Sequence, residues 1–366
     1  MRGFQLAIVC VVLALSGCTN RGDDGDQLAE SGESAASAAE LSPEVAEFVS
    51  AGAADYEQYC AFCHGDEGQG YLADDANALN NPTFLATATD DFLRAAIVHG
   101  RPGTPMSGWG VEKGGPLTED QVSDLVAFIR EWQTVPSVEL SDEPLTGTAG
   151  RGRGPYNVYC ASCHALDGLG GSGPALANPW LLHTASDEYL RYAIVHGRPS
   201  TPMAAYGDSL SDTNILNIVA LIRSWQLPVD EDPPPPYEPD FENALINPDG
   251  GVPEFELRED RFVSIHAVAE AIAAGQSVVI VDARPNSDYA LSRIEGAINV
   301  PFYDVSKFAD RFPDDQWLIT YCGCPHAVSG QAADLLRQAG FSRVAVLDEG
   351  FYEWEDAGYS VATSSR

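Results

Sequence analysis

The feature that most constrains how this chain can fold is a five-residue cysteine motif that occurs twice. Cys-x-x-Cys-His spans residues 60–64 and recurs over residues 160–164, 100 positions later. A second stretch, residues 81–106, recurs as residues 178–203 with 18 of 26 positions identical. A repeat of almost 100 residues is too long for a solenoid unit, so it predicts two copies of one small domain.

The cysteine motif is the signature of covalent c-type haem attachment. Two thiols three positions apart on one helical turn can both form thioethers with haem vinyl groups, and the adjacent imidazole then faces the iron. A zinc site would need a second Cys or His pair at finger spacing in each copy, and neither copy has one. We therefore expect two covalently bound haem c groups. The predicted attachments are Cys60, Cys63, Cys160 and Cys163, and the predicted iron ligands are His64 and His164.

Each copy keeps a single methionine, Met106 or Met203, in the same Thr-Pro-Met context. We expect its sulfur to be the second axial ligand of the iron, because the proline stiffens the loop that presents it. The alternative is a methionine that only fills a gap in the core. A histidine, the rival ligand, and an arginine that could pair with a haem propionate also repeat in this stretch. They are His99, His196, Arg101 and Arg198.

Residues 44–133 and 147–227 resemble two class I-type cytochrome c domains through these motifs. The resemblance implies a small all-α fold that carries electrons, with terminal helices crossing over a buried haem. A closing amphipathic helix is predicted after Thr118 in the first copy and after Ser211 in the second, because apolar residues follow each at helical spacing. An opening helix is predicted over residues 45–59, and the second copy has less room for one.

The pattern of residue types changes after residue 262, where short runs of β-branched residues alternate with segments of helical spacing. Strands that alternate with helices predict an α/β domain with a parallel sheet. The run over residues 277–282 is rich in valine and isoleucine, as suits a buried parallel strand. The predicted strands are 277–282, 297–300, 317–321 and 343–347, and the predicted helices are 265–274 and 329–339.

Residues from about 260 to 362 resemble a rhodanese domain. The resemblance rests on Val281-Asp282-Ala-Arg284, Asp288-Tyr289, Gly296-Ala-Ile-Asn-Val-Pro301, Tyr321-Cys322, Glu349-Gly350-Phe-Tyr-Glu-Trp354 and Ala357-Gly358-Tyr359. It implies parallel strands wrapped by helices and a cysteine after a central strand that carries sulfane sulfur as a persulfide. Cys322 matches that cysteine. Backbone N–H groups of such a loop, and the helix N-terminus after it, would favour the thiolate.

The loop after Cys322 departs from the family pattern. It reads Cys322-Gly-Cys324-Pro-His326-Ala-Val-Ser329, one residue longer than usual and without the usual arginine. Cys324 could resolve a persulfide on Cys322, and His326 could act as acid or base or raise the thiolate content. The alternatives are an inactive domain used for docking, and a thiol or metal sensor built from the same three side chains.

The first residues resemble a bacterial lipoprotein leader. Arg2 precedes a short apolar run that ends on Leu-Ser-Gly-Cys18, and the run is too brief for a membrane span. The resemblance implies that Cys18 is lipidated and that the protein is anchored on the periplasmic side of a bacterial membrane; a plain signal peptide or a retained anchor helix is the alternative. The predicted divisions are leader 1–18, flexible tether 19–42, cytochrome domains 44–133 and 147–227 joined by linker 134–146, Pro-rich linker 228–254 and rhodanese-like domain 255–366.

The charge of the chain bears on its partners. It carries 20 Lys+Arg against 54 Asp+Glu, a net charge of −34, which argues against nucleic acid because a phosphate backbone would be repelled. The expected partners are an unidentified redox protein, a small sulfur compound and a membrane reached through the lipid anchor.

The predicted fold is two small all-α cytochrome domains followed by an α/β rhodanese-like domain. From this fold we expect an exported dihaem cytochrome that transfers electrons. We expect this transfer to be coupled to sulfane-sulfur or thiol chemistry at Cys322, with sulfurtransferase activity as an open question. The alternatives are a pure electron carrier with an inactive docking domain, and the thiol or metal sensor.

Overall fold

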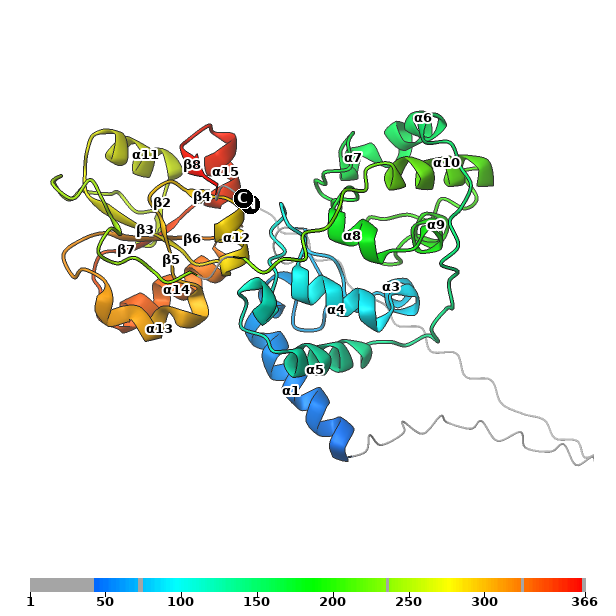
Figure 1. Cartoon of the computed structure of the whole chain (residues 1–366), viewed down its shortest axis with the longest axis horizontal. Coiled ribbons are helices and arrows are strands. Elements are labelled where there is room, and N and C mark those ends of the chain that lie inside the picture. The colour runs from blue at the N-terminus through cyan, green and yellow to red at the C-terminus, as the bar shows by residue number, and fades with distance from the viewer. Residues whose placement is uncertain (1–42, 72–74, 235–236, 324–325, 364–366) are drawn as a thin grey trace, which may run out of the picture. The chain divides into compact units, whose positions relative to one another are not determined.

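The structure is a computed structural model, and it describes residues 43–71, 75–234, 237–323 and 326–363 (Figure 1). The predicted leader, the lipidation site Cys18 and the tether lie outside the described residues, as does Cys324. Within the described ranges, no helix is both long enough and apolar enough to cross a membrane.

The helical part of the chain contains the same series of helices twice. Each series has a long opening helix, a one-turn helix that carries the end of the cysteine motif, two short helices and a long closing helix. The first helical repeat comprises α1 (Pro43–Tyr59), α2 (Ala61–His64), α3 (Pro82–Thr87), α4 (Asp90–His99) and α5 (Glu119–Arg130). The second helical repeat comprises α6 (Ala149–Tyr159), α7 (Ala161–His164), α8 (Pro179–Thr184), α9 (Asp187–His196) and α10 (Asp212–Arg223).

The opening and closing helices of each repeat pack against each other, α1 on α5 and α6 on α10. A glycine marks each crossing. A Cβ atom on Gly52 would lie 2.1 Å from the carbonyl oxygen of Asp124, and one on Gly152 would lie 2.1 Å from that of Asn217. Only glycine allows backbones to approach this closely.

The predicted closing helices are confirmed, and so are their N-caps. Thr118 forms a capping box with Gln121 at the start of α5, and the side chain of Ser211 accepts a hydrogen bond from the backbone N–H of Asn214. The expectation that the second copy has little room for an opening helix is wrong, because α6 begins at Ala149. Its glycines and Pro155 are poor helix formers, and packing on α10 stabilises the helix instead.

The C-terminal part is an α/β domain with a mostly parallel sheet in the order β1-β3-β6-β7-β2, and β5 also pairs with β3. The four predicted strands and two predicted helices are confirmed with ends shifted by a few residues. The sheet strands are β1 (Leu245–Ile246), β2 (Phe262–Val263), β3 (Val278–Asp282), β5 (Ile298–Asn299), β6 (Leu318–Tyr321) and β7 (Val344–Leu347). A small antiparallel pair consists of β4 (Arg293–Ile294) and β8 (Val361–Ala362).

Helices cover both faces of this sheet (Figure 1). Side chains of β3 alternate between two hydrophobic clusters, with Val279 and Val281 in one and Val278 and Ile280 in the other. The first cluster includes residues of α13 (Val305–Phe308) and α14 (Ala327–Gln338), and the second includes residues of α11 (Ile265–Ala273) and α15 (Gly350–Asp356). Shorter helices of this domain are α12 (Asn286–Leu291), η2 (Phe302–Asp304) and η3 (Ala309–Arg311). The short helix η1 (Val111–Lys113) lies between α4 and α5 in the first helical repeat.

The segment predicted as a Pro-rich spacer is bonded to the first helical repeat and to the sheet of the C-terminal domain. Its end forms β1, which pairs antiparallel with β3 at the edge of the sheet. Near its start, the side-chain amine of Lys113 donates to the carbonyl oxygens of Asp230 and Asp232 at 3.1 and 2.8 Å. The spacer prediction is therefore wrong for β1, which is part of the sheet, and proline content alone could not reveal this pairing.

Candidate functional site

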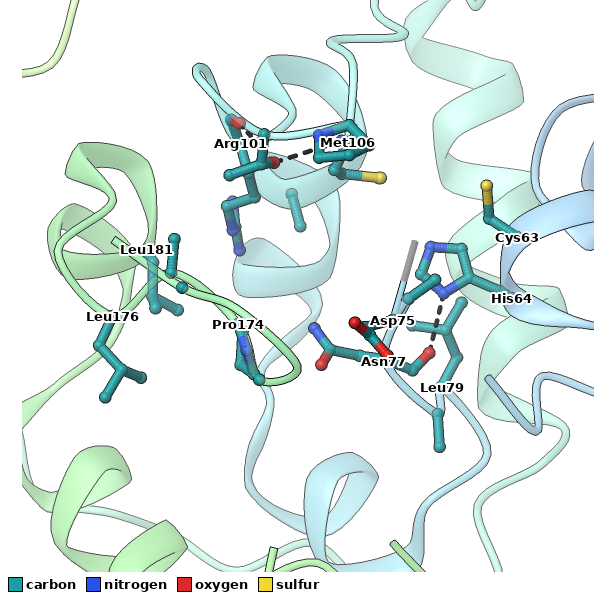
Figure 2. A pocket seen from close by; sticks show the side chains of 18 of the residues that line it. Cys63, His64, Asp75, Asn77, Leu79, Arg101, Met106, Pro174, Leu176 and Leu181 are labelled. Carbon is teal, nitrogen blue, oxygen red and sulfur yellow. Dashed lines mark hydrogen bonds between the residues drawn. The ribbon is translucent and has the colours of Figure 1, made fainter. Parts of the chain in front are cut away.

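Both cysteine motifs and both Thr-Pro-Met segments line one cavity of about 510 Å³. Aliphatic and aromatic side chains such as Phe92, Ile97 and Leu181 make up much of its wall. Figure 2 shows Cys63 and His64 on one side of this cavity, with the sulfur atom of Met106 pointing toward that side in the view drawn. The structure thus brings the predicted attachment and ligand residues of both repeats to a single space.

Each motif histidine is oriented by a backbone carbonyl. The Nδ1 atom of His64 lies 2.8 Å from the carbonyl oxygen of Asn77, and that of His164 lies 2.8 Å from the carbonyl oxygen of Pro174. Because a carbonyl only accepts, Nδ1 carries the proton and Nε2 keeps its lone pair. Burial lowers the pKa of both histidines, which favours the neutral imidazole that binds iron.

The first cysteine of each motif is a poor candidate for thiolate chemistry. Burial raises the pKa of Cys60 to about 12 and that of Cys160 to about 11, whereas reactive or zinc-binding cysteines have lowered pKa values. No disulfide joins the five cysteines that the structure describes. Protonated thiols beside an apolar cavity suit attachment to a flat apolar group better than redox exchange.

Hydrogen bonds within each Thr-Pro-Met loop fix its conformation. The backbone N–H of Arg101 donates to the carbonyl of Met106 at 2.7 Å, and the hydroxyl of Thr104 donates to the carbonyl of Arg101 at 2.7 Å. The second repeat has the same two bonds, at 2.8 Å between Arg198 and Met203 and at 2.7 Å from Thr201 to Arg198. The two methionines therefore sit in loops closed by hydrogen bonds, and these loops need little further ordering before the methionine sulfur can bind iron.

Two arginines of these loops also line the cavity, as the sequence suggested for haem propionates. Burial lowers the pKa of Arg101 to about 10, and no ion pair to Arg101 is found among the residues that the structure describes. The guanidinium of Arg198 lies 3.4 Å from the hydroxyl of Thr83. A buried guanidinium without a carboxylate partner suits an anionic group, so the donor set, the apolar wall and the arginines together fit haem c.

The rival histidine ligands are used elsewhere. His99 stacks on Trp180 with ring centroids 3.5 Å apart, and His196 packs against Tyr192 with ring centroids 4.1 Å apart. Neither histidine is among the residues that line the cavity. This arrangement leaves Met106 and Met203 as the candidates for the second axial position.

Cys322 follows the central strand β6 and is almost completely buried, with 1% of its surface exposed. Its sulfur lies 3.2 Å from the hydroxyl of Ser329 in the first turn of α14. Cys322, Gly323 and Tyr352 line the same cavity as the cysteine motifs. A Cβ atom on Gly323 would lie 3.8 Å from the Cα atom of Pro105, so the loop after Cys322 contacts the Thr-Pro-Met loop of the first repeat.

Two family models match the chain. One, described as cytochrome C oxidase, cbb3-type, subunit III, matches residues 47–129 and 147–222, and the other, described as a rhodanese-like domain, matches residues 264–357. The chain is also 32% identical over 98 residues to the thiosulfate sulfurtransferase GlpE of Shewanella oneidensis, an alignment that covers 26% of this chain and 94% of that protein. The C-terminal domain of this chain belongs to the rhodanese family.

Other relatives match the chain over different lengths. The chain is 26% identical over 199 residues to the Cbb3-type cytochrome c oxidase subunit CcoP of an Azospirillum species, which covers 48% of this chain and 62% of that protein. It is 36% identical over 88 residues to an HTH-type transcriptional regulator of Mycobacterium tuberculosis, which covers 23% and 37%. The chain therefore spans less than two thirds of the length of either protein. The family match makes the helical region a cytochrome c-type region, which implies a haem c cofactor.

The Asp282-Ala-Arg284 stretch of the rhodanese domain forms a buried ion pair. Arg284 donates to both carboxylate oxygens of Asp282, at 2.9 and 2.6 Å, and the hydroxyl of Tyr321 donates to the same carboxylate at 2.6 Å. Arg284 also lines the cavity, but its charge is already matched by Asp282. It is therefore a weak substitute for the arginine that the loop after Cys322 lacks.

The structure places His326 beside Asp348 and Phe262. The Nε2 atom of His326 lies 2.8 Å from a carboxylate oxygen of Asp348, and its ring packs on Phe262 with centroids 4.1 Å apart. Asp348 also accepts from Arg258, whose hydrogen bond is the main reason that the pKa of Asp348 is lowered. His326 does not appear in the wall of the cavity that contains Cys322.

Sequence reasoning missed a pair of asparagines that lock the repeats together. The side-chain nitrogen of Asn81 donates to the carbonyl of Pro199 at 2.8 Å, and that of Asn178 donates to the carbonyl of Pro102 at 3.1 Å. The side-chain oxygens of the same residues cap α3 and α8. The Asn-Pro pair was visible in both copies, but a cap within one repeat would have explained it without the contact between repeats.

Proposed function

We propose that this protein transfers electrons through two covalently bound haem c groups and that sulfur chemistry at Cys322 supplies those electrons. Each repeat would attach one group through its two motif cysteines, and the motif histidine and the loop methionine would bind the iron. When bound, the two groups supply two one-electron redox centres. The observation that supports the coupling is that Cys322 and both cysteine motifs line one cavity.

The proposed reaction converts the Cys322 thiol and hydrogen sulfide into a Cys322 persulfide. One S–S bond forms, one S–H bond of each sulfur breaks, and two protons and two electrons are released. The hydroxyl of Ser329, 3.2 Å from the sulfur of Cys322, is placed to hold or relay the thiol proton. The contact between Gly323 and Pro105 favours the first repeat as the first electron acceptor.

An anaerobic titration of the oxidised full-length protein with sulfide tests this proposal. We expect the visible spectrum to report two electrons per chain, and intact-mass analysis to find one added sulfur atom on Cys322. A Cys322→Ser variant should show neither change, and a Cys324→Ser variant should still take up the sulfur if Cys324 only resolves the persulfide. Full reduction of the Cys322→Ser variant by sulfide would refute the coupling.

A pure electron carrier with an inactive rhodanese-like domain is the second candidate. Its support is that Cys322 is buried and that Arg284, the rhodanese-domain arginine in the described wall of the cavity, is already paired with Asp282 and so binds an anionic sulfur donor such as thiosulfate poorly. Under this function the Cys322→Ser variant would keep the electron-transfer rate of the unmodified protein with every sulfur compound tested.

We also propose that the chain is exported and lipid-anchored through Cys18, with the domain divisions predicted from the sequence. Support comes from the leader pattern and from the similarity to a cbb3-type oxidase subunit. Metabolic labelling with a fatty-acid analogue should mark the unmodified protein in its native host, and a Cys18→Ala variant should lose the label and leave the membrane fraction.

A further inference from the structure

The two helical repeats differ in what covers the tyrosine that precedes each cysteine motif. Tyr59 is 9% exposed, and its ring centroid lies 6.0 Å from that of Phe302 and 6.4 Å from that of Tyr303, both in the rhodanese-like domain. Tyr159 is 38% exposed and packs on Tyr206 of its own repeat. The tyrosine at this position is therefore covered by another domain in the first repeat and lies at the surface in the second.

Several exposed residues close in sequence to Tyr159 are apolar, whereas the matching positions of the first repeat are polar. Three side chains there are the most exposed large hydrophobic residues in the described part of the chain: Val158 at 74%, Leu169 at 68% and Leu166 at 63%. The corresponding residues of the first repeat are Gln58, Gln69 and Asp66. We call Val158, Tyr159, Leu166 and Leu169 the apolar patch.

The apolar patch borders the cavity that contains the cysteine motifs. Tyr159 and Leu169 belong to the wall of that cavity, as do Cys160 and Cys163. The guanidinium of Arg153 on α6 donates to the carbonyl of Leu166 at 2.8 Å, which holds this part of the patch against the helix that carries Val158. An exposed apolar area beside a redox centre is a position where another protein can exclude water.

The charge beside the patch differs from that of the rest of the protein. Helix α6 contains Arg151 and Arg153, both exposed, and no acidic residue, in a chain of net charge −34. The exposed Asp167 lies between Leu166 and Leu169 and is the one acidic residue within that stretch of the patch, away from the α6 side. The matching helix α1 carries Asp55 and Glu57 and no basic residue. The rim next to Val158 is therefore complementary to carboxylates.

We propose that the apolar patch is the docking surface for a second redox protein, whose docking face is apolar at its centre and carries carboxylates at its rim. Electrons would leave the protein through the second repeat, because the rhodanese-like domain already covers Tyr59 in the first. This inference rests on the electron-transfer part of the proposed function and does not need the chemistry at Cys322. Small, weak interfaces with an apolar centre are typical of such encounters.

A binding titration followed by NMR tests the proposal. The probe is an isotope-labelled acidic blue-copper protein, titrated with the full-length holoprotein at low and moderate salt. We expect line broadening at the probe's apolar face, weakened by salt. A variant that gives the second repeat the residues of the first, Val158→Gln with Leu166→Asp and Leu169→Gln, should bind at least about tenfold more weakly.

The matched control makes three equivalent changes at other exposed hydrophobic residues, Val111→Gln, Val138→Gln and Leu291→Asp. It should bind within about twofold of the unmodified protein. Arg151→Glu should weaken binding and flatten its salt dependence.

Three results would overturn the proposal. One is unchanged affinity of the patch variant, and another is tighter binding of a basic monohaem cytochrome than of the acidic probe. The third is self-association of the unmodified protein in sedimentation that the patch variant abolishes, since a second copy of the chain would then cover the patch. Binding is measured independently of the reaction at Cys322, so failure of the sulfide titration leaves this test intact.

Discussion

The two helical repeats contain nearly the same residues in the stretches that face each other and different residues on the surfaces that face elsewhere. Asn81 and Asn178 make the same cap and the same bond to the opposite repeat. Tyr59 and Tyr159 are also the same residue, but one is covered by the rhodanese-like domain and the other is exposed. Identical asparagines thus make the same contacts where the repeats face each other, whereas identical tyrosines have different neighbours because the rhodanese-like domain contacts the first and Tyr206 contacts the second.

The largest expected effect comes from removing one haem attachment site at a time, which tests whether the two repeats behave alike. A Cys60→Ser, Cys63→Ser variant should lose one covalent group completely, and a Cys160→Ser, Cys163→Ser variant should lose the other. Intact-mass analysis should find the same loss in both, with the remaining repeat still loaded. If either variant lost both groups while its circular dichroism stayed unchanged, the repeats would not mature independently.

A smaller effect is expected from the asparagines between the repeats. Asn81→Asp and Asn178→Asp keep the oxygen that caps the helix but remove the donor to the opposite repeat. Each should lower the free energy of unfolding by about 0.5–1.5 kcal/mol, because a part-buried carbonyl of the opposite repeat loses its donor. Urea denaturation measures this loss of stability, and Asn157→Asp, at an exposed asparagine of α6, serves as the control. A large loss in one variant and none in the other would contradict the reciprocal arrangement.

The smallest effect concerns the pH dependence of stability at His99. Burial, followed by the charges of Lys113 and Arg101, lowers the pKa of His99 to about 4. Because the folded state then binds the proton less readily than the unfolded chain, this contribution to stability is present above about pH 6.5 and is lost as the pH falls toward 4. Glu112, 3.8 Å away, and residual exposure moderate the effect.

In a His99→Gln variant, the denaturation midpoint should change less with pH between 6.5 and 4 than it does in the unmodified protein. His196→Gln, at the matching position of the second repeat, is the control, since His196 packs on Tyr192 and lacks the stacking on Trp180. An equal change in both variants would show that the effect does not come from the surroundings of His99.

The sequence predicted those parts of the molecule whose chemistry is local. The two cysteine motifs, the caps at Thr118 and Ser211 and the β-branched run of β3 each carry their own signal, and the structure contains the expected helices and strand. What it could not predict depends on tertiary partners. Helix α6 is stabilised by α10 despite poor helix formers, and strand β1 comes from a proline-rich segment.

The candidate site divides in the same way. The attachment cysteines and loop methionines were found from their repeated pattern and line one cavity. Their orientation by the carbonyls of Asn77 and Pro174 could not be found, because a backbone acceptor leaves no trace in the residue type. The pairing of His326 with Asp348 was missed because 22 residues separate them in the chain.

The bonding of Lys113 has a practical consequence for handling the protein. The sequence contains two lysines, and Lys113 is buried with its amine held by two carbonyls, whereas Lys307 is exposed on the rhodanese-like domain. Amine-directed reagents should therefore label one lysine side chain selectively. A dye or a sensor surface coupled there would report on binding while leaving Val158 and its apolar neighbours unmodified.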